Sequence, residues 1–379
     1  MGTKKDPLSW LDQYAAERRA AGLRRALRPR PELDPMIDLA SNDYLGLVDH
    51  PDVIAGAIDS IRRWGTGSTG SRLVTGTTAE HHDLERELAE FTGAETGLVF
   101  ASGYAANLGV VTSLAGRGTL IVSDSNSHAS LVDACRLSRA RVVITPHGDV
   151  SAVQHVLRER TEERALVITD SVFSADGDLA PLAELHAVTR AADAVLVADE
   201  AHGIGVRGQG RGLVYELGLA GAEDLVITAT LSKALASQGG VVLASGRVRD
   251  HLVDSARTFI FDTGLAPGAV GAARAALRVL QAEPERADAV LRNACRLAAA
   301  TNAAKPESAV VSVVLGDAER AYAASLACAE RGLRVGCFRP PSVPEGTSRL
   351  RLTARATLTD DDLDTIEAVL TEVLATVPS

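Results

Sequence analysis

The sequence predicts an α/β protein in which a large domain, built on a mostly parallel seven-stranded sheet, precedes a smaller α+β domain. Three observations support this prediction. The chain has 379 residues, which is long for one hydrophobic core. Seven short apolar runs recur through its first two thirds. Segments with helical periodicity separate most of these runs, which is the pattern of repeated βαβ units.

The seven apolar runs are the predicted strands of the large sheet. None of them alternates apolar and polar residues, so each fits a strand that is buried on both faces. They cover residues 96–100, 119–123, 141–145, 165–169, 194–198, 224–228 and 240–244. Helical segments such as 81–91 and 181–192 lie between them, so we expect parallel strands with helices on both sides of the sheet.

The segments outside these runs predict the remaining parts of the chain. Residues 8–27 have the pattern of an arginine-rich amphipathic helix, and a long alanine-rich helical stretch begins after Pro267. The elements that follow are a strand at 309–315, a helix at 318–331, a strand at 349–354 and a helix from 360 to about 374. We therefore expect an N-terminal helix and arm over 1–45, a large domain over 46–270, and a small α+β domain over 271–379.

Composition argues against several functional classes. A net charge of -10 is unfavourable for binding nucleic acid or an anionic membrane surface. We expect no transmembrane helix, since no apolar stretch of 18 residues is free of charge, and the N-terminus does not resemble a signal peptide. The four cysteines form no CxxC pair, which predicts reduced thiols, as in a cytoplasmic protein. No metal site is expected.

The distribution of lysine points to one reactive residue. The chain contains only Lys4, Lys5, Lys233 and Lys305, and arginine takes the other basic positions. Lys233 follows the run 224–228, and the carboxyl ends of parallel strands are where α/β sheets bind ligands. An ordinary surface lysine is the alternative, but the scarcity of lysine favours a partly desolvated amine that can form Schiff bases.

Other predicted strand ends carry groups that complement this amine. Gly103 and Tyr104 open a helix whose free N–H groups could bind a phosphate. His128 is either a helix cap or an aromatic ring that stacks on a flat cofactor. Ser174 offers a hydroxyl, and Asp199 offers a carboxylate that could pair with a cationic heterocycle or cap a helix. These groups converge with the lysine at one edge of the sheet.

Two familiar motifs, one of helicases and one of nicotinamide-binding proteins, give little support for those functions. Residues 199–202 spell the DEAH box of a helicase class, but the chain lacks the GxxxxGK[ST] loop that such a protein needs. The GxGxxG matches at 65–70 and 203–208 do not lead from a strand into a helix, so they give poor support for a nicotinamide cofactor.

Longer motifs resemble a known family. They are ERRAAGLRR, SNDYLGL, SGYAAN, SHASL, DSVFSADGD, DEAHGIG, TLSKA and RPPSVPEGTSRLRLT, and they run from the first predicted helix to the small domain. With these motifs the chain resembles the α-oxoamine synthases, which are fold-type I transferases dependent on pyridoxal 5'-phosphate. The resemblance implies an acyltransferase that condenses L-alanine with a pimeloyl thioester, carried by coenzyme A or an acyl carrier protein, and releases carbon dioxide in biotin biosynthesis. It also implies a homodimer with a shared active site, to which the partner contributes the loop 65–71.

The resemblance assigns three catalytic roles. Lys233 would hold the cofactor as a Schiff base and then transfer protons, Asp199 would pair with the pyridine nitrogen, and His128 would stack on the ring and meet the substrate. Further cofactor contacts would come from Gly103, Tyr104 and Thr230 at the phosphate, and from Ser174 and His202 near the phenolic oxygen.

The resemblance also implies the substrate contacts. Arg339 would hold the amino-acid carboxylate with Ser342 beside it, Arg24 would face the acyl substrate, and Asn42 would support the closed site. Two positions depart from the family pattern: Asp170 stands where glutamate is usual, and the surroundings of Thr263 are atypical.

Two alternatives remain beside this interpretation. Serine palmitoyltransferase keeps an arginine at the position of Arg339, whereas relatives that use glycine usually lack it. Four arginines of the first predicted helix favour a dicarboxylic acyl chain over a long apolar one: Arg18, Arg19, Arg24 and Arg25. A binding protein with a decayed site is the other alternative, and the joint presence of Lys233, Asp199 and His128 argues against it.

Overall fold

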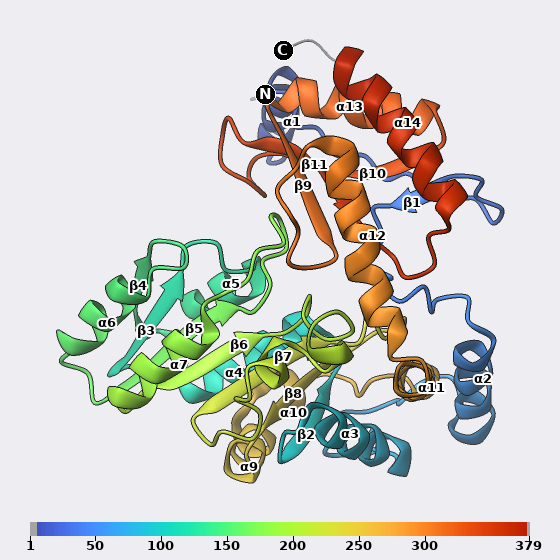
Figure 1. The fold of residues 1–379 in the computed structure, drawn as a ribbon. Helices are drawn as coiled ribbons and strands as arrows, with labels where there is room; N and C mark the ends of the chain where they lie inside the picture. Colours follow the sequence, from blue (N-terminus) through green and yellow to red (C-terminus); the bar gives the residue numbers. More distant parts are fainter. Residues whose placement is uncertain (1–5, 377–379) are drawn as a thin grey trace, which may run out of the picture.

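The computed structural model describes residues 6–376, which form two sheets surrounded by helices (Figure 1). Figure 1 shows the small sheet and the C-terminal helices at one end of the molecule, with α12 running from them toward the large sheet. The helices are α1 (Trp10–Ala20), α2 (Pro51–Trp64), α3 (Ala79–Thr92), α4 (Gly103–Leu114), α5 (Ala129–Ser138), α6 (Val150–Arg158), α7 (Leu182–Ala191), the 3-10 helix η1 (Gly208–Gly210), α8 (Leu213–Glu216), α9 (Gly246–Ser255), α10 (Arg257–Ile260), α11 (Pro267–Ala282), α12 (Glu285–Thr301), α13 (Ala318–Glu330) and α14 (Asp360–Thr376).

The large sheet has seven strands in the order β2-β8-β7-β6-β5-β3-β4. Its strands are β2 (Thr96–Phe100), β3 (Thr119–Asp124), β4 (Arg141–Thr145), β5 (Arg164–Asp170), β6 (Val195–Asp199), β7 (Leu225–Thr230) and β8 (Gly240–Ala244). Only β8 runs antiparallel to its two neighbours. The predicted α/β class and the mostly parallel seven-stranded sheet are thus confirmed, with each strand at its predicted run.

The two-sided burial of these strands explains why their sequences are continuously apolar. Along β5, Ala165 and Val167 belong to one hydrophobic core, while Leu166 and Ile168 belong to a second core on the opposite face. Helices α4, α5, α9 and α10 cover the second face, whereas α3, α6, α7 and α11 cover the first. Since successive side chains of a strand point to opposite faces, both parities must be apolar when both faces are covered.

The small sheet contains two strands that the sequence pattern did not reveal. Its order is β1-β10-β11-β9, with β1 (Ile37–Leu39), β9 (Val310–Gly316), β10 (Leu333–Phe338) and β11 (Ser348–Thr353). The short strand β1 comes from the N-terminal arm and pairs in parallel with β10. The predicted domain limits at 45 and 270 remain predictions, although β1 links the arm to the C-terminal sheet.

The first predicted helix is shorter than expected. The pattern over 8–27 predicts one helix, but α1 ends at Ala20 and the chain continues as an irregular arm. Gly22 has a φ of 65°, in the left-handed region that ends a right-handed helix. The arginine-rich stretch after residue 22 is therefore an exposed arm rather than a helix face. Among residues 6–376, no helix is both long and apolar enough to cross a lipid bilayer.

Candidate active site

The candidate site lies at the edge of the large sheet where its parallel strands end. Gly103 opens α4 just after β2, and His128 is the N-cap of α5 just after β3. Asp170 and Asp199 are the last residues of β5 and β6, and Lys233 follows β7 by three residues. The sequence prediction that these groups share one edge of the sheet agrees with this topology.

The amine of Lys233 is held in a poorly hydrated position. Its Nζ lies 2.7 Å from Nε2 of His202, and although part of the side chain is exposed, the amine end is deeply buried. Burial lowers the pKa of Lys233 to about 8; the charges of Asp199 and Asp170 oppose this shift, and that of Arg351 adds to it. At neutral pH roughly a tenth of the amine is therefore unprotonated, far more than for a hydrated lysine.

His202 connects this lysine to the N-terminal arm. Its Nδ1 is hydrogen-bonded to the hydroxyl of Tyr44, which is fully buried. Burial holds the pKa of His202 well below its usual value, and the neighbouring charges of Lys233 and Arg351 lower it further. His202 is therefore a neutral imidazole whose orientation is set by Tyr44 on one side and the lysine on the other.

The buried carboxylate of Asp199 accepts hydrogen bonds from a side chain and from the backbone. Asn107 Nδ2 donates to its Oδ2 at 2.7 Å, and the N–H of Ala201 donates to its Oδ1 at 2.9 Å. The hydroxyl of Thr228 donates to the side-chain oxygen of Asn107 at 2.6 Å, which fixes the orientation of that amide. The carboxylate is thereby positioned without an ion pair among the described residues. Such a group suits a cationic partner supplied from outside the chain.

His128 and Asp170, at the ends of neighbouring strands, are hydrogen-bonded to each other in the site. The N–H of His128 donates to Oδ2 of Asp170 at 2.8 Å, and its Nδ1 lies 2.7 Å from the hydroxyl of Ser130. Burial lowers the pKa of His128, so its ring is neutral. Burial, reinforced by nearby Asp199, raises the pKa of Asp170 well above its usual value. Asp170 thus anchors the backbone of His128 by accepting this hydrogen bond.

A cradle of backbone groups lies at the start of α4. The N–H groups of Gly103 and Tyr104 have no acceptor among the described residues, as is usual for the first turn of a helix. A Cβ at position 103 would come within 3.1 Å of Cβ of Thr230, so glycine permits this close approach. The Thr230 hydroxyl accepts from the N–H of Ser232 at 3.1 Å. These donors and hydroxyls could bind a phosphate.

The predicted substrate residues fall into two groups. Asn42 lies within the cluster of residues around Lys233 and His202. Its Oδ1 accepts hydrogen bonds from Tyr44 at 3.3 Å and from Arg351 at 2.9 Å. Ser174 also borders it, because its carbonyl accepts from Nε of Arg351 at 2.7 Å. In the described chain, no hydrogen bond or ion pair links the other three to this cluster: Arg24, Arg339 and Ser342.

Arg24 and Arg339 instead line a hollow between the N-terminal arm and Tyr322 of α13. Arg339 donates to the carbonyl of Gly22, and its guanidinium lies 4.6 Å from the ring centre of Tyr322. Ser342 is exposed in the loop that follows. Thr263, the other uncertain position, is exposed in a bridge to Ser71.

Three residues of the cluster escaped the sequence analysis. Tyr44, Asn107 and Arg351 all lie inside recognised motifs, namely SNDYLGL, SGYAAN and RLRLT, yet nothing in the local pattern marks them as functional. Arg351 is the most informative of the three. It is 3% exposed, and its Nη2 has no hydrogen-bond partner in the structure. A buried, unsatisfied guanidinium nitrogen beside Lys233 indicates a place for an anionic group.

Together these residues fit pyridoxal phosphate. Lys233 would supply an amine for the aldehyde, Asp199 a carboxylate for the ring nitrogen, and His128 a flat neutral ring. The N–H groups at the start of α4 would supply donors for the phosphate, with the Thr230 hydroxyl beside them. The fit rests on the chemistry of this donor set, because each functional group of the cofactor finds a complementary group at the same edge of the sheet.

Comparison with known proteins agrees with this site. The family model described as aminotransferase class I and II matches residues 34–370. A curated relative from Mycobacterium sp. (strain KMS), an 8-amino-7-oxononanoate synthase, is 67% identical over 370 residues, which is 97% of each chain. A relative with the same name from Mycolicibacterium paratuberculosis is 66% identical over 97% of each chain.

Solved structures extend this similarity. A structure of SPT with a PLP internal aldimine has a TM-score of 0.91 and 31% identity, over 98% of this chain and 99% of that chain. An 8-amino-7-oxononanoate synthase from Francisella tularensis has a TM-score of 0.77 and 25% identity, over 90% of this chain and 98% of that chain.

The fold and the site define a fold-type I transferase that uses pyridoxal phosphate. The chain belongs to the aminotransferase class I and II family and, within it, to the 8-amino-7-oxononanoate synthases.

Proposed function

We propose that this chain condenses L-alanine with a pimeloyl thioester and releases 8-amino-7-oxononanoate, carbon dioxide and the free thiol. Identity of 67% over nearly the whole chain to a protein of that activity is the observation that carries the proposal. The cluster of Lys233, Asp199 and His128 supports it, because these groups are needed for chemistry at the α-carbon of an amino acid. A non-catalytic binding protein would have no need for a desolvated lysine.

The roles of the residues follow from their positions. When bound, pyridoxal phosphate supplies a ring that accepts the electron pair left on carbon as a proton or carboxylate departs. Asp199 keeps the ring nitrogen protonated, because a buried carboxylate favours a proton on a neighbouring base. Lys233 Nζ first anchors the cofactor, then takes the α-proton of L-alanine and later returns a proton to the product. His202, neutral and hydrogen-bonded to this amine, orients it for both steps.

Two arginines are candidates for binding the carboxylate of L-alanine. Arg339 is the residue that the family resemblance implies, and Arg351 is the residue that the geometry favours. Arg351 is buried beside Lys233 and holds Asn42 with Nη1, and its Nη2 has no partner among residues 6–376. The unpartnered Nη2 can donate a charge-assisted hydrogen bond to a carboxylate oxygen, while Nη1 stays on Asn42. We therefore assign the carboxylate to Arg351 and Asn42.

Conservative substitution should separate the two candidates. Arg351→Lys keeps the charge but loses the planar fork, so the KM for L-alanine should rise about 10- to 100-fold, the cost of one or two charge-assisted hydrogen bonds. Arg349→Lys on the same strand is a matched control, since that buried arginine pairs with Asp176 and should leave this KM within about twofold. Steady-state kinetics with L-alanine varied would contradict the assignment if Arg339→Lys raised the KM and Arg351→Lys did not.

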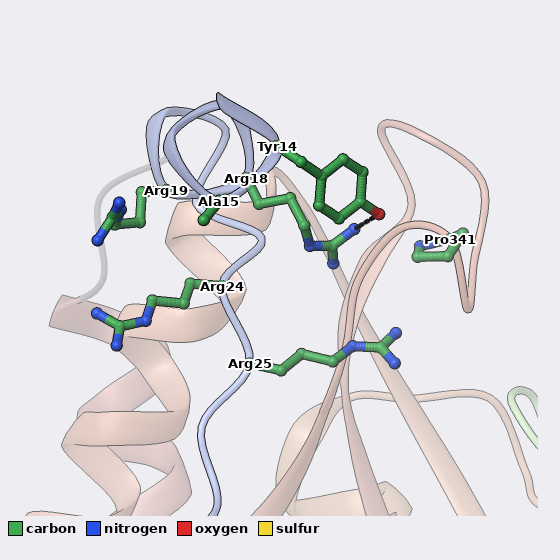
Figure 2. A pocket seen from close by; sticks show the side chains of 7 residues that line it. All are labelled: Tyr14, Ala15, Arg18, Arg19, Arg24, Arg25 and Pro341. Carbon is green, nitrogen blue, oxygen red and sulfur yellow. Dashed lines mark hydrogen bonds between the residues drawn. The ribbon is translucent and has the colours of Figure 1, made fainter. Parts of the chain in front are cut away.

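The acyl substrate is tested by direct competition. The arginine-rich arm favours a chain that ends in a carboxylate, and serine palmitoyltransferase is the alternative among structural relatives. We expect kcat/KM to be at least about 100-fold higher for pimeloyl thioester with L-alanine than for palmitoyl thioester with L-serine, because the terminal methyl group of a palmitoyl chain makes no ion pair with the arginines of the arm (Figure 2). A preference for palmitoyl thioester and serine would overturn the proposed substrates while leaving the cofactor chemistry intact.

We also propose that the chain forms a homodimer with a shared active site. One face of α2 presents Ile54, Ile58, Ile61 and Trp64, each at least 40% exposed. Leu73 and Val74, which follow the glycine-rich loop 65–71, are exposed as well. An apolar stripe of this kind is typical of a surface that a second protein chain covers. Contact along α2 would bring the loop 65–71 toward the partner.

Sedimentation equilibrium tests this dimer. The wild-type protein should sediment at twice its 39.6 kDa mass, and Ile54→Glu/Ile58→Glu should shift it toward one chain by placing charges in an apolar contact. Leu137→Glu, at an exposed apolar residue of α5 outside this stripe, is the matched control and should stay dimeric. A monomeric wild-type protein with full activity would rule out a shared site.

A further inference from the structure

The hydroxyl of Ser130 joins His128 to the hydrogen bonds around Asp199. Ser130 is fully buried in the first turn of α5, and its Oγ lies 2.7 Å from Nδ1 of His128. The same oxygen accepts a hydrogen bond from Nδ2 of Asn107 at 2.8 Å. Within residues 6–376, no other hydrogen bond reaches this hydroxyl. The proton arrangement on His128 therefore depends on which way this single contact runs.

The side-chain amide of Asn107 can lie in one orientation only. Its Nδ2 is 2.7 Å from Oδ2 of Asp199, and a carboxylate accepts hydrogen bonds but does not donate them. Its Oδ1 accepts from the hydroxyl of Thr228 at 2.6 Å. One N–H of the amide therefore points to Asp199 and the other to Ser130. The reversed amide would bring its own oxygen against the carboxylate.

This orientation fixes the direction of the hydrogen bond between Ser130 and His128. Because Ser130 Oγ accepts from Asn107, its own hydrogen must be donated elsewhere or be left unsatisfied in a buried place, which is costly. Nδ1 of His128 is the acceptor within reach. The backbone N–H of Ser130 is directed at the same nitrogen, at 3.3 Å. Two donors thus meet Nδ1, so the proton of the neutral ring is on Nε2.

The protonated nitrogen is free to meet a ligand. Nε2 of His128 has no hydrogen-bond partner in the part of the chain that the structure describes. The residue is partly exposed, and the charges of Asp199 and Lys233 act on its ring. An N–H at this place offers a hydrogen bond to a ligand oxygen, whereas the other tautomer would direct a lone pair at that oxygen.

We propose that Ser130 is a positioning residue which, together with Asn107, holds His128 as the tautomer protonated on Nε2 and so gives the site a hydrogen-bond donor. One amide serves both Asp199 and Ser130, so the carboxylate and the histidine are ordered by the same side chain. The effect on turnover rests on the proposed function, because a substrate oxygen would be the acceptor. The tautomer itself does not rest on it.

Nitrogen-15 NMR of the histidine side chains reads the tautomer directly, in the apoenzyme and in the holoenzyme. His128, identified by the signals that His128→Asn removes, should show a protonated Nε2 and an unprotonated Nδ1. Ser130→Ala should move both signals toward the average of the two tautomers, because Nδ1 loses its hydroxyl donor. Ser138→Ala is the matched control, since that serine is also buried in α5 but donates to the carbonyl of Cys135 at 2.7 Å. It should leave the His128 signals unchanged.

Steady-state kinetics of the same variants then measure the effect on turnover. Ser130→Ala should lower kcat/KM for the condensation about tenfold, the size expected when one orienting hydrogen bond is lost. Ser130→Thr keeps a hydroxyl and should restore the wild-type tautomer and most of this activity, while Ser138→Ala should retain it.

The NMR result decides the tautomer even if the wild-type protein does not catalyse the proposed reaction, so the two failures are distinguishable. A wild-type His128 protonated on Nδ1 would overturn the proposal, and this outcome needs no variant to fold. Unchanged signals in Ser130→Ala, or an equal loss of activity in Ser138→Ala, would also overturn it.

Discussion

The site depends on one constraint: an amine and a carboxylate are withdrawn from water at the ends of adjacent strands, yet they are not paired with each other. Lys233 is hydrogen-bonded to neutral His202, and Asp199 accepts from Asn107 and the backbone. Burying charges in this way is costly unless a ligand complements them. A flat cofactor with an aldehyde at one side and a basic nitrogen at another satisfies both groups at once.

The surrounding structure maintains this separation. Thr228 fixes the amide of Asn107, which in turn holds Asp199, and the same amide reaches Ser130 beside His128. On the other side, Tyr44 holds His202, so the arm and the large sheet meet at the lysine. The hydrogen bonds form two separate groups, one around Asp199 and one around Lys233, and such polar networks specify geometry more than they add stability. The catalytic groups are therefore positioned by several elements rather than by one loop.

Much of this arrangement was predictable from the sequence because it follows from strand ends. A strand that is buried on both faces is apolar throughout, so the seven strands could be predicted from the sequence, together with the polar groups that follow them. The short strand β1 was not, since three residues carry no periodicity and their pairing with β10 is a long-range contact. The helix over 8–27 was overestimated because arginine and alanine favour helix on both sides of Gly22, whose backbone conformation ends it.

Side-chain networks were the least predictable part of the site. Arg351 lies on a strand that alternates arginine and leucine, and only the fold reveals that one of its nitrogens is buried without a partner. Asn107 resembles an ordinary helix residue until Asp199 is brought beside it. By contrast, the sequence alone singles out Lys233 as the candidate, because it is the one lysine of four that follows a predicted strand.

The most direct test of the account is to find which lysine carries the cofactor. Borohydride reduction of the holoenzyme converts a Schiff base into a stable secondary amine, which peptide mass mapping can locate. The account predicts loss of the visible absorbance and a single pyridoxyl adduct on the peptide that contains Lys233, with Lys305 as the internal comparison. An adduct on Lys4, Lys5 or Lys305, with Lys233 unmodified, would contradict it.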